Sequence, residues 1–242
     1  MSPSTGRAQF ACGYVLHQRP YRDTSLIVEL YTRDHGRMSA FARAARGPRS
    51  RFSGLQPFRP LLLSWSGRGE AATLSAAEPD GTPSAPLVAD RLLSAFYLNE
   101  LLLKLTVVHD PQPELFALYA TTLEQMRTAA ALDPVLRQFE KRLLDLLGYG
   151  SDMSREASGR AVAADAHYHF RPGEGLWPAD AALSGAVPGR VLLALAANES
   201  LGDPEGQRQI RTLLRAALDH CLDGRELRVR AVARAVAKME RA

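Results

Sequence analysis

The stretch SLIVELYTRDHGRMSAFARAA, residues 25–45, decides the fold of the first third of the chain. Its first part, SLIVELYTR (25–33), is rich in β-branched and aromatic residues, which favour extended backbone. Asp34-His35-Gly36 is a turn signal, and RMSAFARAA (37–45) follows it as a second extended run. Two such runs joined by a glycine-containing connection predict a β-hairpin.

Three further extended runs surround this hairpin. FACGYVLHQ (10–18) precedes it, and PFRPLLLSWS (57–66) and EAATLSAAE (70–78) follow it. The connections contain Gly or Pro, and no helical period interrupts the runs. Five short strands in the first 80 residues predict a small β-barrel, whose longest and most basic connection is at about 46–56.

The segment EPDGTPSAP (78–86) is rich in Pro, Gly and Ser and indicates a domain boundary. Beyond it the apolar residues recur with helical period, and we expect helices at about 87–105, 113–126, 133–147, 188–198, 204–222 and 224–240. Residues 149–185 are irregular in pattern. The prediction is an α+β protein with a five-stranded barrel in residues 1–80. A mostly α-helical domain in residues 81–242 follows, with an irregular insert at about 149–185.

Composition narrows the class of protein. Hydrophobic residues make up 46% and charged residues 23%, as in ordinary globular proteins. No apolar run reaches membrane-spanning length, since the run at Leu101–Leu103, for example, is broken by Glu100 and Lys104, and the first ten residues have no hydrophobic signal-peptide core. Cys12 and Cys221 are far apart, which argues against a disulfide framework or a four-cysteine zinc site. We expect a cytoplasmic protein without membrane contact.

Basic residues gather in the first third of the chain. Residues 1–80 carry 11 arginines against 6 acids, whereas residues 81–242 carry 19 basic residues against 20 acids. Between His35 and Gly69 there are seven arginines and no acid. Such a basic field is typical of a polyanion binder. A solvated loop and codon bias toward arginine are the alternatives, but bias does not explain the missing acids.

We expect arginines on two connections of the barrel to hold the phosphates of DNA, with affinity that falls steeply as salt rises. The predicted DNA contacts are Arg19, Arg22, Arg37, Arg43, Arg46, Arg49, Arg51 and Phe52. The connection HQRPYRDTS (17–25) has an alternative reading as a tight turn in which Arg19 or Arg22 pairs with Asp23.

Three phenylalanines, Phe41, Phe52 and Phe58, interleave with these arginines and are able to stack on bases. Phe41 and Phe58 lie in predicted strands, where packing in the core is favoured. Phe52 lies in the loop, and both base stacking and core packing stay open for it.

Other segments carry weaker signals. His167 and His169 would share one face of a strand, but two histidines alone make a weak metal site, so a surface strand is preferred. Arg137 and Lys141 flank an apolar helix face, typical of bundle packing or of a groove for an acidic, hydrophobic peptide tail. The basic segment 225–241 fits a DNA surface or a solvated helix face. No catalytic constellation or nucleotide loop is present, so we predict no enzymatic activity and no cofactor.

Several blocks of the sequence together resemble the RecO family of bacterial DNA repair proteins. They are VLHQRPYRDTSL (15–26), ARGPR (45–49), LQPFRPLLL (55–63), YLNELL (97–102) and LRQFEKRLLDLLGYG (136–150), with HYHFRPGEGL (167–176). The resemblance covers most of the chain. It implies an N-terminal OB-fold followed by a helical domain. It also implies binding of single- and double-stranded DNA, annealing of complementary strands, and association with the nucleoid when DNA is bound.

The resemblance further implies two protein partners. These are the acidic C-terminal tail of the single-strand DNA-binding protein and RecR, so that recombinase can load onto coated DNA. The tail-binding role carries over to Arg137, which matches a basic position of the LRxFE block, and to Leu98, Leu101 and Phe139. Many family members hold zinc with four cysteines after the LGYG element, but residues 151–162 contain none here, so no metal is expected.

Two rival functions stay open at this point. An OB-fold RNA binder would carry the same basic loop and would differ in its response to the 2′-hydroxyl. A protein-interaction adaptor, whose arginines bind acidic peptides, would bind DNA only weakly.

Overall fold

The computed structural model describes residues 7–47, 50, 52, 54–67, 72–199 and 203–239. Contacts divide the chain into two compact units, one of residues 1–129 and 227–242 and one of residues 130–226. The first unit therefore contains the barrel together with helices that follow it. The division into domains 1–80 and 81–242 separates barrel from helices along the chain, and it stays a prediction.

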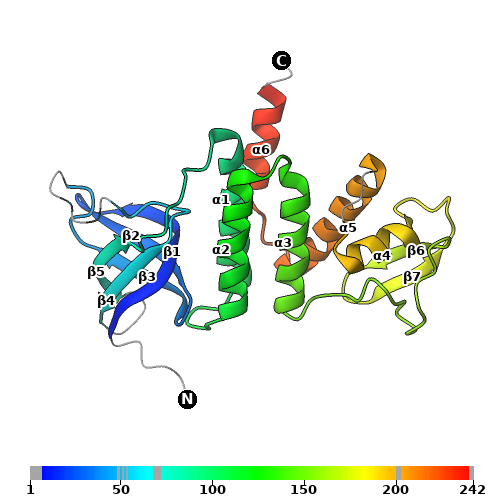
Figure 1. Ribbon diagram of the computed structural model, residues 1–242, viewed down its shortest axis with the longest axis horizontal. Coiled ribbons are helices and arrows are strands. Elements are labelled where there is room, and N and C mark those ends of the chain that lie inside the picture. The colour runs from blue at the N-terminus through cyan, green and yellow to red at the C-terminus, as the bar shows by residue number, and fades with distance from the viewer. Residues whose placement is uncertain are drawn as a thin grey trace. The chain divides into compact units, whose positions relative to one another are not determined.

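Five strands of the first unit form a closed barrel in the order β1-β2-β3-β5-β4 (Figure 1). They are β1 (Arg7–Tyr21), β2 (Ser25–Thr32), β3 (Gly36–Ala42), β4 (Leu61–Ser66) and β5 (Ala72–Pro79). The quoted stretch forms the β2–β3 hairpin, in which Leu26 pairs with Ala42 and Thr32 with Gly36. A parallel pairing of β3 with β5 and an antiparallel pairing of β1 with β4 close the barrel. The predicted five-stranded barrel is confirmed, and its strand order is that of an OB-fold.

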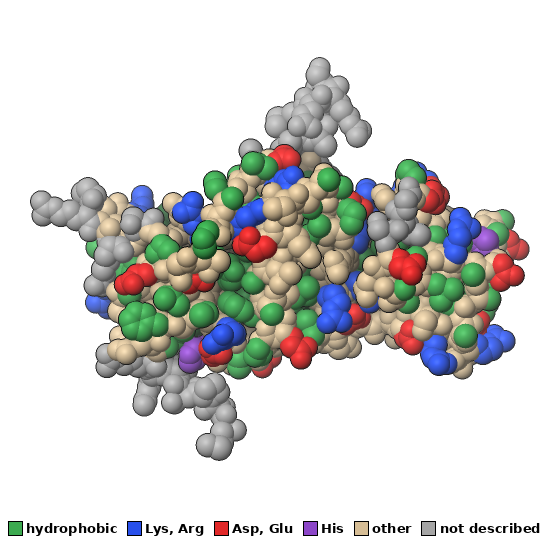
Figure 2. Space-filling view, in the orientation of Figure 1, with side chains coloured by type: hydrophobic (Ala, Val, Ile, Leu, Met, Phe, Trp, Pro, Cys, Tyr) green, Lys and Arg blue, Asp and Glu red, His purple; other side chains and the backbone are tan. Residues whose placement is uncertain are grey.

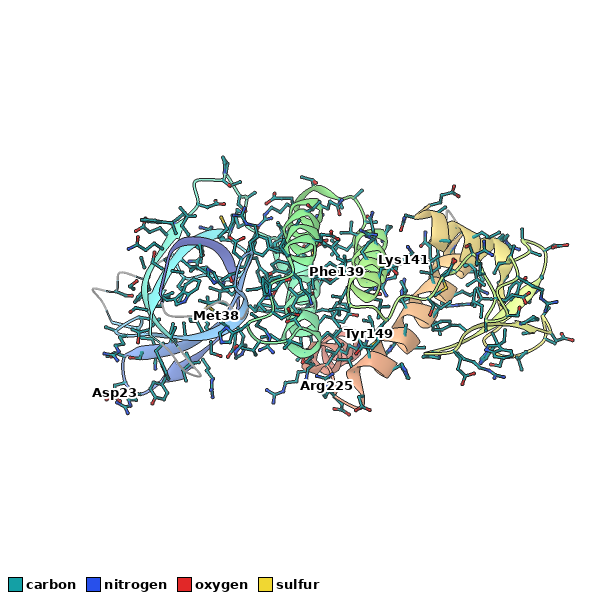
Figure 3. The ribbon with its side chains drawn as sticks, turned by 90° about the horizontal axis from the view of Figure 1, so that it is seen from below. Asp23, Met38, Phe139, Lys141, Tyr149 and Arg225 are labelled. Atoms are coloured by element: carbon teal, nitrogen blue, oxygen red, sulfur yellow. The ribbon has the colours of Figure 1, made fainter. Side chains whose placement is uncertain are left out.

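Alternation along the strands fills the barrel interior. In β3, Met38, Ala40 and Ala42 are buried, while Arg37, Ser39 and Phe41 lie on the outer side. Figure 3 shows Met38 inside the ring of strands, and Asp23 at its outer rim. The interior is completed by large apolar side chains from the other four strands, which are Val15, Val28, Leu30, Leu61, Leu63, Trp65 and Leu74. This pattern follows from the two-residue period of a strand with one face in the core.

Two helices cover part of the outer side of the barrel. α1 (Ala89–Leu105) and α2 (Pro113–Thr128) follow the predicted ranges. Tyr14 of β1 contacts Phe116 and Tyr119 of α2 with ring centroids 5.5 and 5.1 Å apart, and Tyr31 of β2 contacts the same two rings. Aromatic residues that face outward on β1 and β2 are therefore buried by a helix rather than by the barrel interior.

Buried hydrogen bonds fix α1 within this unit. The Asn99 side chain donates to the carbonyl oxygen of Leu16 at 2.8 Å, and the Tyr119 hydroxyl donates to the Asn99 carbonyl oxygen at 2.6 Å. The N-terminus of α6 (Arg228–Met239) contacts α1. The Glu100 carboxylate accepts hydrogen bonds from the backbone N–H groups of Arg228 and Val229. A carboxylate at a helix N-terminus satisfies backbone donors that have no partner within the helix.

The second unit contains α3 (Leu132–Leu146), α4 (Gly189–Ala197), α5 (Pro204–Leu222) and a three-stranded sheet in the order β7-β6-β8. The strands are β6 (His167–Arg171), β7 (Gly175–Ala179) and β8 (Val187–Pro188). Part of the stretch predicted as irregular thus forms the β6–β7 hairpin, of which the sequence analysis anticipated the first strand and missed the second, a run of only five residues. Within the described ranges, no helix has both the length and the apolar content to cross a lipid bilayer.

Candidate nucleic-acid interface

Two basic connections meet at one end of the barrel. Tyr21 pairs with Ser25 at the end of the β1–β2 hairpin, and Leu26 pairs with Ala42 at the end of β3. The backbone N–H of Arg46 then donates to the carbonyl oxygen of Thr24 at 2.8 Å. This bond joins the segment after β3 to the β1–β2 turn, so arginines that are far apart in sequence lie on neighbouring loops.

Four of the predicted DNA contacts are exposed at this end: Arg22, Arg43 and Arg46 on the two connections and Arg19 near the end of β1. No ion pair among the described residues involves any of them. The guanidinium of Arg22 lies over the Tyr21 ring at 5.3 Å instead of pairing with Asp23, which disfavours the turn held by an arginine–aspartate pair. On the face drawn in Figure 2, acidic and basic side chains are interspersed. We call these four residues the arginine end.

An aromatic pair borders the arginine end. The Tyr21 and Phe41 rings lie 5.2 Å apart at an interplanar angle of 49°, and both side chains are half-buried on the outer side of the barrel. Ile27 of β2 pairs with Arg19 of β1 and with Phe41 of β3, so an apolar residue lies between the arginine and the phenylalanine. The expectation that Phe41 packs in the core is wrong. The two-residue period of β3, which places Phe41 on the same face as Arg37, is the signal that identifies its outward position.

Phe52, unlike Phe41, lies in the barrel core. Its side chain is 4% exposed and belongs to the barrel core, together with Leu55 three residues later. A ring enclosed on both faces cannot stack on a base, so the predicted DNA contact by Phe52 is wrong and core packing accounts for it. Phe58 is also buried, as predicted, and meets Phe96 of α1 edge to face at 4.9 Å.

Arg37 has a structural role in the same unit. Its side chain is only 17% exposed, and it donates to the side-chain and backbone oxygens of Thr106 at 3.3 and 3.1 Å. One nitrogen also lies 3.8 Å from the Glu29 carboxylate. The guanidinium therefore ties β3 to the end of α1, a structural role that argues against the predicted phosphate contact by Arg37. Arg49 and Arg51 lie outside the described residues.

The residues carried over for tail binding do not present an open groove. Leu98, Leu101 and Phe139 each have no exposed surface. Arg137 is 16% exposed, and one of its nitrogens lies 2.6 Å from the buried carboxylate of Glu140 on the same helix. Leu98 and Leu101 belong to the first compact unit and the other two to the second. Core packing accounts for the three apolar residues, because each of them is fully buried.

The histidines of β6 show no sign of a metal site. His169 pairs in register with Trp177 of β7, and His167 pairs with Ala179. Within the described part of the chain, no three His, Cys, Asp or Glu side chains come together as metal ligands. The surface strand preferred from the sequence is present as β6.

Comparisons with known proteins agree with this geometry. Residues 11–82 match the family described as Recombination protein O N terminal, and residues 88–231 match Recombination protein O C terminal. The DNA repair protein RecO of Alkalilimnicola ehrlichii is 46% identical over 95% of this chain and 92% of its own length. The DNA repair protein RecO of Chromobacterium violaceum is 42% identical over 96% of both chains. That of Methylococcus capsulatus is 43% identical over 90% of this chain and 89% of its own length. This chain belongs to the RecO family of DNA repair proteins.

Proposed function

We propose that this chain is a recombination mediator that binds single- and double-stranded DNA without sequence specificity. In the same proposal it anneals complementary strands and helps to load recombinase onto DNA coated by single-strand DNA-binding protein. Family membership supports the general role in DNA repair and recombination. The observation that carries the finer proposal is the arginine end, with four exposed arginines that form no ion pair with any described residue, beside the Tyr21–Phe41 ring pair.

The arrangement suits single-stranded DNA in two ways. Exposed guanidinium groups neutralise phosphates and release counterions, which supplies affinity without reading the bases. Aromatic rings on the outer side of an OB barrel stack on bases of any kind. Tyr21 and Phe41 are half-buried, so they offer ring faces that are already held in place. No hydrolytic step is part of this proposal.

Annealing follows from the same charges. Two complementary strands repel each other through their phosphates, and a basic surface that holds both lowers this repulsion and raises their local concentration. We include the acidic tail of single-strand DNA-binding protein and RecR as partners on the strength of the family resemblance. Of the four residues considered for the tail, Arg137 keeps a partly exposed guanidinium, although it is already paired with Glu140.

The test compares two variants that lose the same charge. In the first, Arg19, Arg22, Arg43 and Arg46 are changed to Ala. In the control, four exposed and ion-paired arginines, Arg33, Arg155, Arg171 and Arg208, are changed to Ala. We expect the first variant to bind a labelled single-stranded oligonucleotide at least about tenfold more weakly and to anneal strands more slowly. The control should stay within about twofold of the wild type.

The same assay separates the rival functions. Equal or tighter binding of the matching RNA strand by the wild type would favour an RNA-binding protein. Weak DNA binding by the wild type, with strong binding of an acidic peptide, would favour the adaptor. Identical behaviour of the two variants would remove the arginine end from the binding surface.

A further inference from the structure

A second aromatic site lies on the barrel, next to β4 and β5. The Phe10 side chain is 62% exposed, far more than the half-buried Tyr21 and Phe41 rings. It borders a hollow of about 370 Å³ on the outer side of β1, β4 and β5. The other lining residues are Ala8, Gln9, Ser64, Trp65, Ser66 and Ser75. We call this hollow the Phe10 pocket.

Two β-bulges build the pocket. The pairing of β1 with β4 shifts by one residue between Ala8 and Ala11, which places the extra residue of β1 opposite Ser64. The pairing of β4 with β5 also shifts next to Ser64, because Ser64 pairs with Ala76 and Trp65 with Leu74, which leaves Ser75 unpaired. Bulges re-aim side chains and are over-represented beside functional sites. Here they flank one residue of β4 on both sides and turn Phe10 and Ser75 toward the same hollow.

The backbone at Phe10 carries strain. Its φ angle is +55°, in the left-handed region that a residue with a bulky side chain rarely adopts. Its N–H donates to the Ser64 hydroxyl at 3.1 Å, which holds this conformation. Burial does not explain the strain, because the ring is mostly in solvent. A strained residue held by its surroundings supports a functional role for what it displays.

The lining selects the chemistry of the ligand. The lining residues that the structure describes are uncharged, so they do not themselves favour a phosphate or a carboxylate. An aromatic ring beside three serine hydroxyls and one side-chain amide offers a stacking surface with both donors and acceptors at its rim. A flat, polar and neutral ring fits this combination, and the volume is within the range of small-molecule sites. On a barrel proposed to bind single-stranded DNA, the unpaired nucleobase is the group that matches.

We propose that the Phe10 pocket binds an unpaired nucleobase of single-stranded DNA, stacked on the Phe10 ring. The proposal rests on the DNA-binding function proposed above. Phe10 and Tyr21 are both on β1, eleven residues apart, which is at most about 36 Å of extended strand. The barrel thus offers a second stacking site, and Ser66 of its lining lies two strands from Phe41, because Phe41 pairs with Thr73 and Thr73 pairs with Ser66. Two sites are what a protein needs to hold two strands, or two parts of one strand, at the same time.

The test uses a substitution that removes the Phe10 ring and still tolerates the left-handed backbone conformation at this position. Phe10→Asn suits the left-handed conformation, because Asn tolerates it better than other residues. Phe10→Tyr keeps the ring and should behave like the wild type. Trp177→Ala, which removes another exposed aromatic ring in the other compact unit, is the control. A single-stranded 30-mer that contains 5-iododeoxyuridine is bound to each full-length protein, its affinity is measured, and after irradiation the cross-linked peptides are identified by mass spectrometry.

We expect cross-links at Phe10 in the wild type, and about tenfold weaker binding by Phe10→Asn but not by Phe10→Tyr or Trp177→Ala. A wild type that binds the 30-mer without cross-links at Phe10, together with an unchanged affinity of Phe10→Asn, would overturn the pocket and leave the arginine end standing. A wild type that does not bind the 30-mer at all would overturn both proposals. Cross-links at Tyr21 and Phe41 alone would also exclude the Phe10 pocket as a base site.

Discussion

The burial of Phe52 leads to a prediction that separates stability from DNA binding. Phe52 comes from the most basic connection of the barrel, where an aromatic residue is a natural candidate for base stacking. The structure places it in the barrel core with 4% of its surface exposed. We therefore expect Phe52→Ala to weaken the fold of the barrel and to leave the intrinsic DNA affinity of the folded protein unchanged.

The magnitude follows from the loss of a buried ring. Truncation of a core phenylalanine to alanine costs about 3–5 kcal/mol, from lost transfer free energy and the cavity that remains. With a urea m value of about 2 kcal/mol/M, the midpoint of barrel unfolding should fall by about 2 M. Phe52→Leu keeps most of the apolar volume and should lose about 1 kcal/mol.

The chain offers a clean probe for this measurement. It has two tryptophans, of which Trp65 is 1% exposed in the barrel core and Trp177 is 41% exposed in the other unit. In a Trp177→Phe background, intrinsic fluorescence reports unfolding of the barrel alone. Urea titrations of this background, with and without Phe52→Ala, give the change in the free energy of unfolding directly.

Phe41→Ala is the matched comparison. Phe41 is half-buried and contacts Tyr21 on the outer side of the barrel, so its loss should cost about 1 kcal/mol of stability and about tenfold in single-strand affinity. The reasoning is refuted if the two variants exchange roles, so that Phe52→Ala loses DNA affinity with little loss of stability.

Three further changes test the packing of the first compact unit by the same fluorescence assay. Arg127→Met should cost about 2–4 kcal/mol of unfolding free energy, because the nearly buried Arg127 side chain donates to the carbonyl oxygens of Phe58 and Ala85. A change below about 0.5 kcal/mol, roughly the error of the method, would contradict this role. Burial raises the pKa of Tyr14 to about 12, whereas the unfolded chain ionises this group near its ordinary value of 10.0. The stability due to the neutral phenol is thus complete below that pH and is lost progressively as pH rises toward 12. The fall in urea midpoint between pH 9 and 11.5 should be smaller in Tyr14→Phe, and an identical fall would exclude Tyr14 as a contributor. Gly36→Ala should cost about 2 kcal/mol or more of unfolding free energy, since φ at Gly36 is +66° and a Cβ there would lie 2.4 Å from the backbone oxygen of Asp110. An unchanged urea midpoint would show that this turn relaxes freely.

The barrel was predictable because its strands carry local signals. β-branched residues, a two-residue period and glycine-containing turns all agree in residues 25–45. It was less predictable that Arg19, Arg22, Arg43 and Arg46 gather at one end. Their positions depend on the backbone hydrogen bond between Arg46 and Thr24 and on the pairing of β2 with β3. In the sequence, the sign of this surface was the excess of basic residues in the first third of the chain.

The errors share one physical cause. Whether a side chain on a connection or helix is exposed depends on contacts that are distant in sequence. Phe52 turns into the barrel core, and Arg37 reaches Thr106 sixty-nine residues away. Leu98 is fully buried. Residue type and charge predict what such a side chain is able to bind, whereas long-range packing determines whether it is available.

The salt dependence of DNA binding tests the central claim most directly. Affinity for a single-stranded oligonucleotide is measured from 50 to 300 mM salt for the wild type, the quadruple arginine-end variant and the ion-paired control variant. Each phosphate contact contributes about 0.7 to the slope of log affinity against log salt. We predict that the arginine-end variant loses about 3 from the slope while the control keeps the wild-type slope. Equal slopes for all three proteins would contradict the assignment of the phosphate contacts to this end of the barrel.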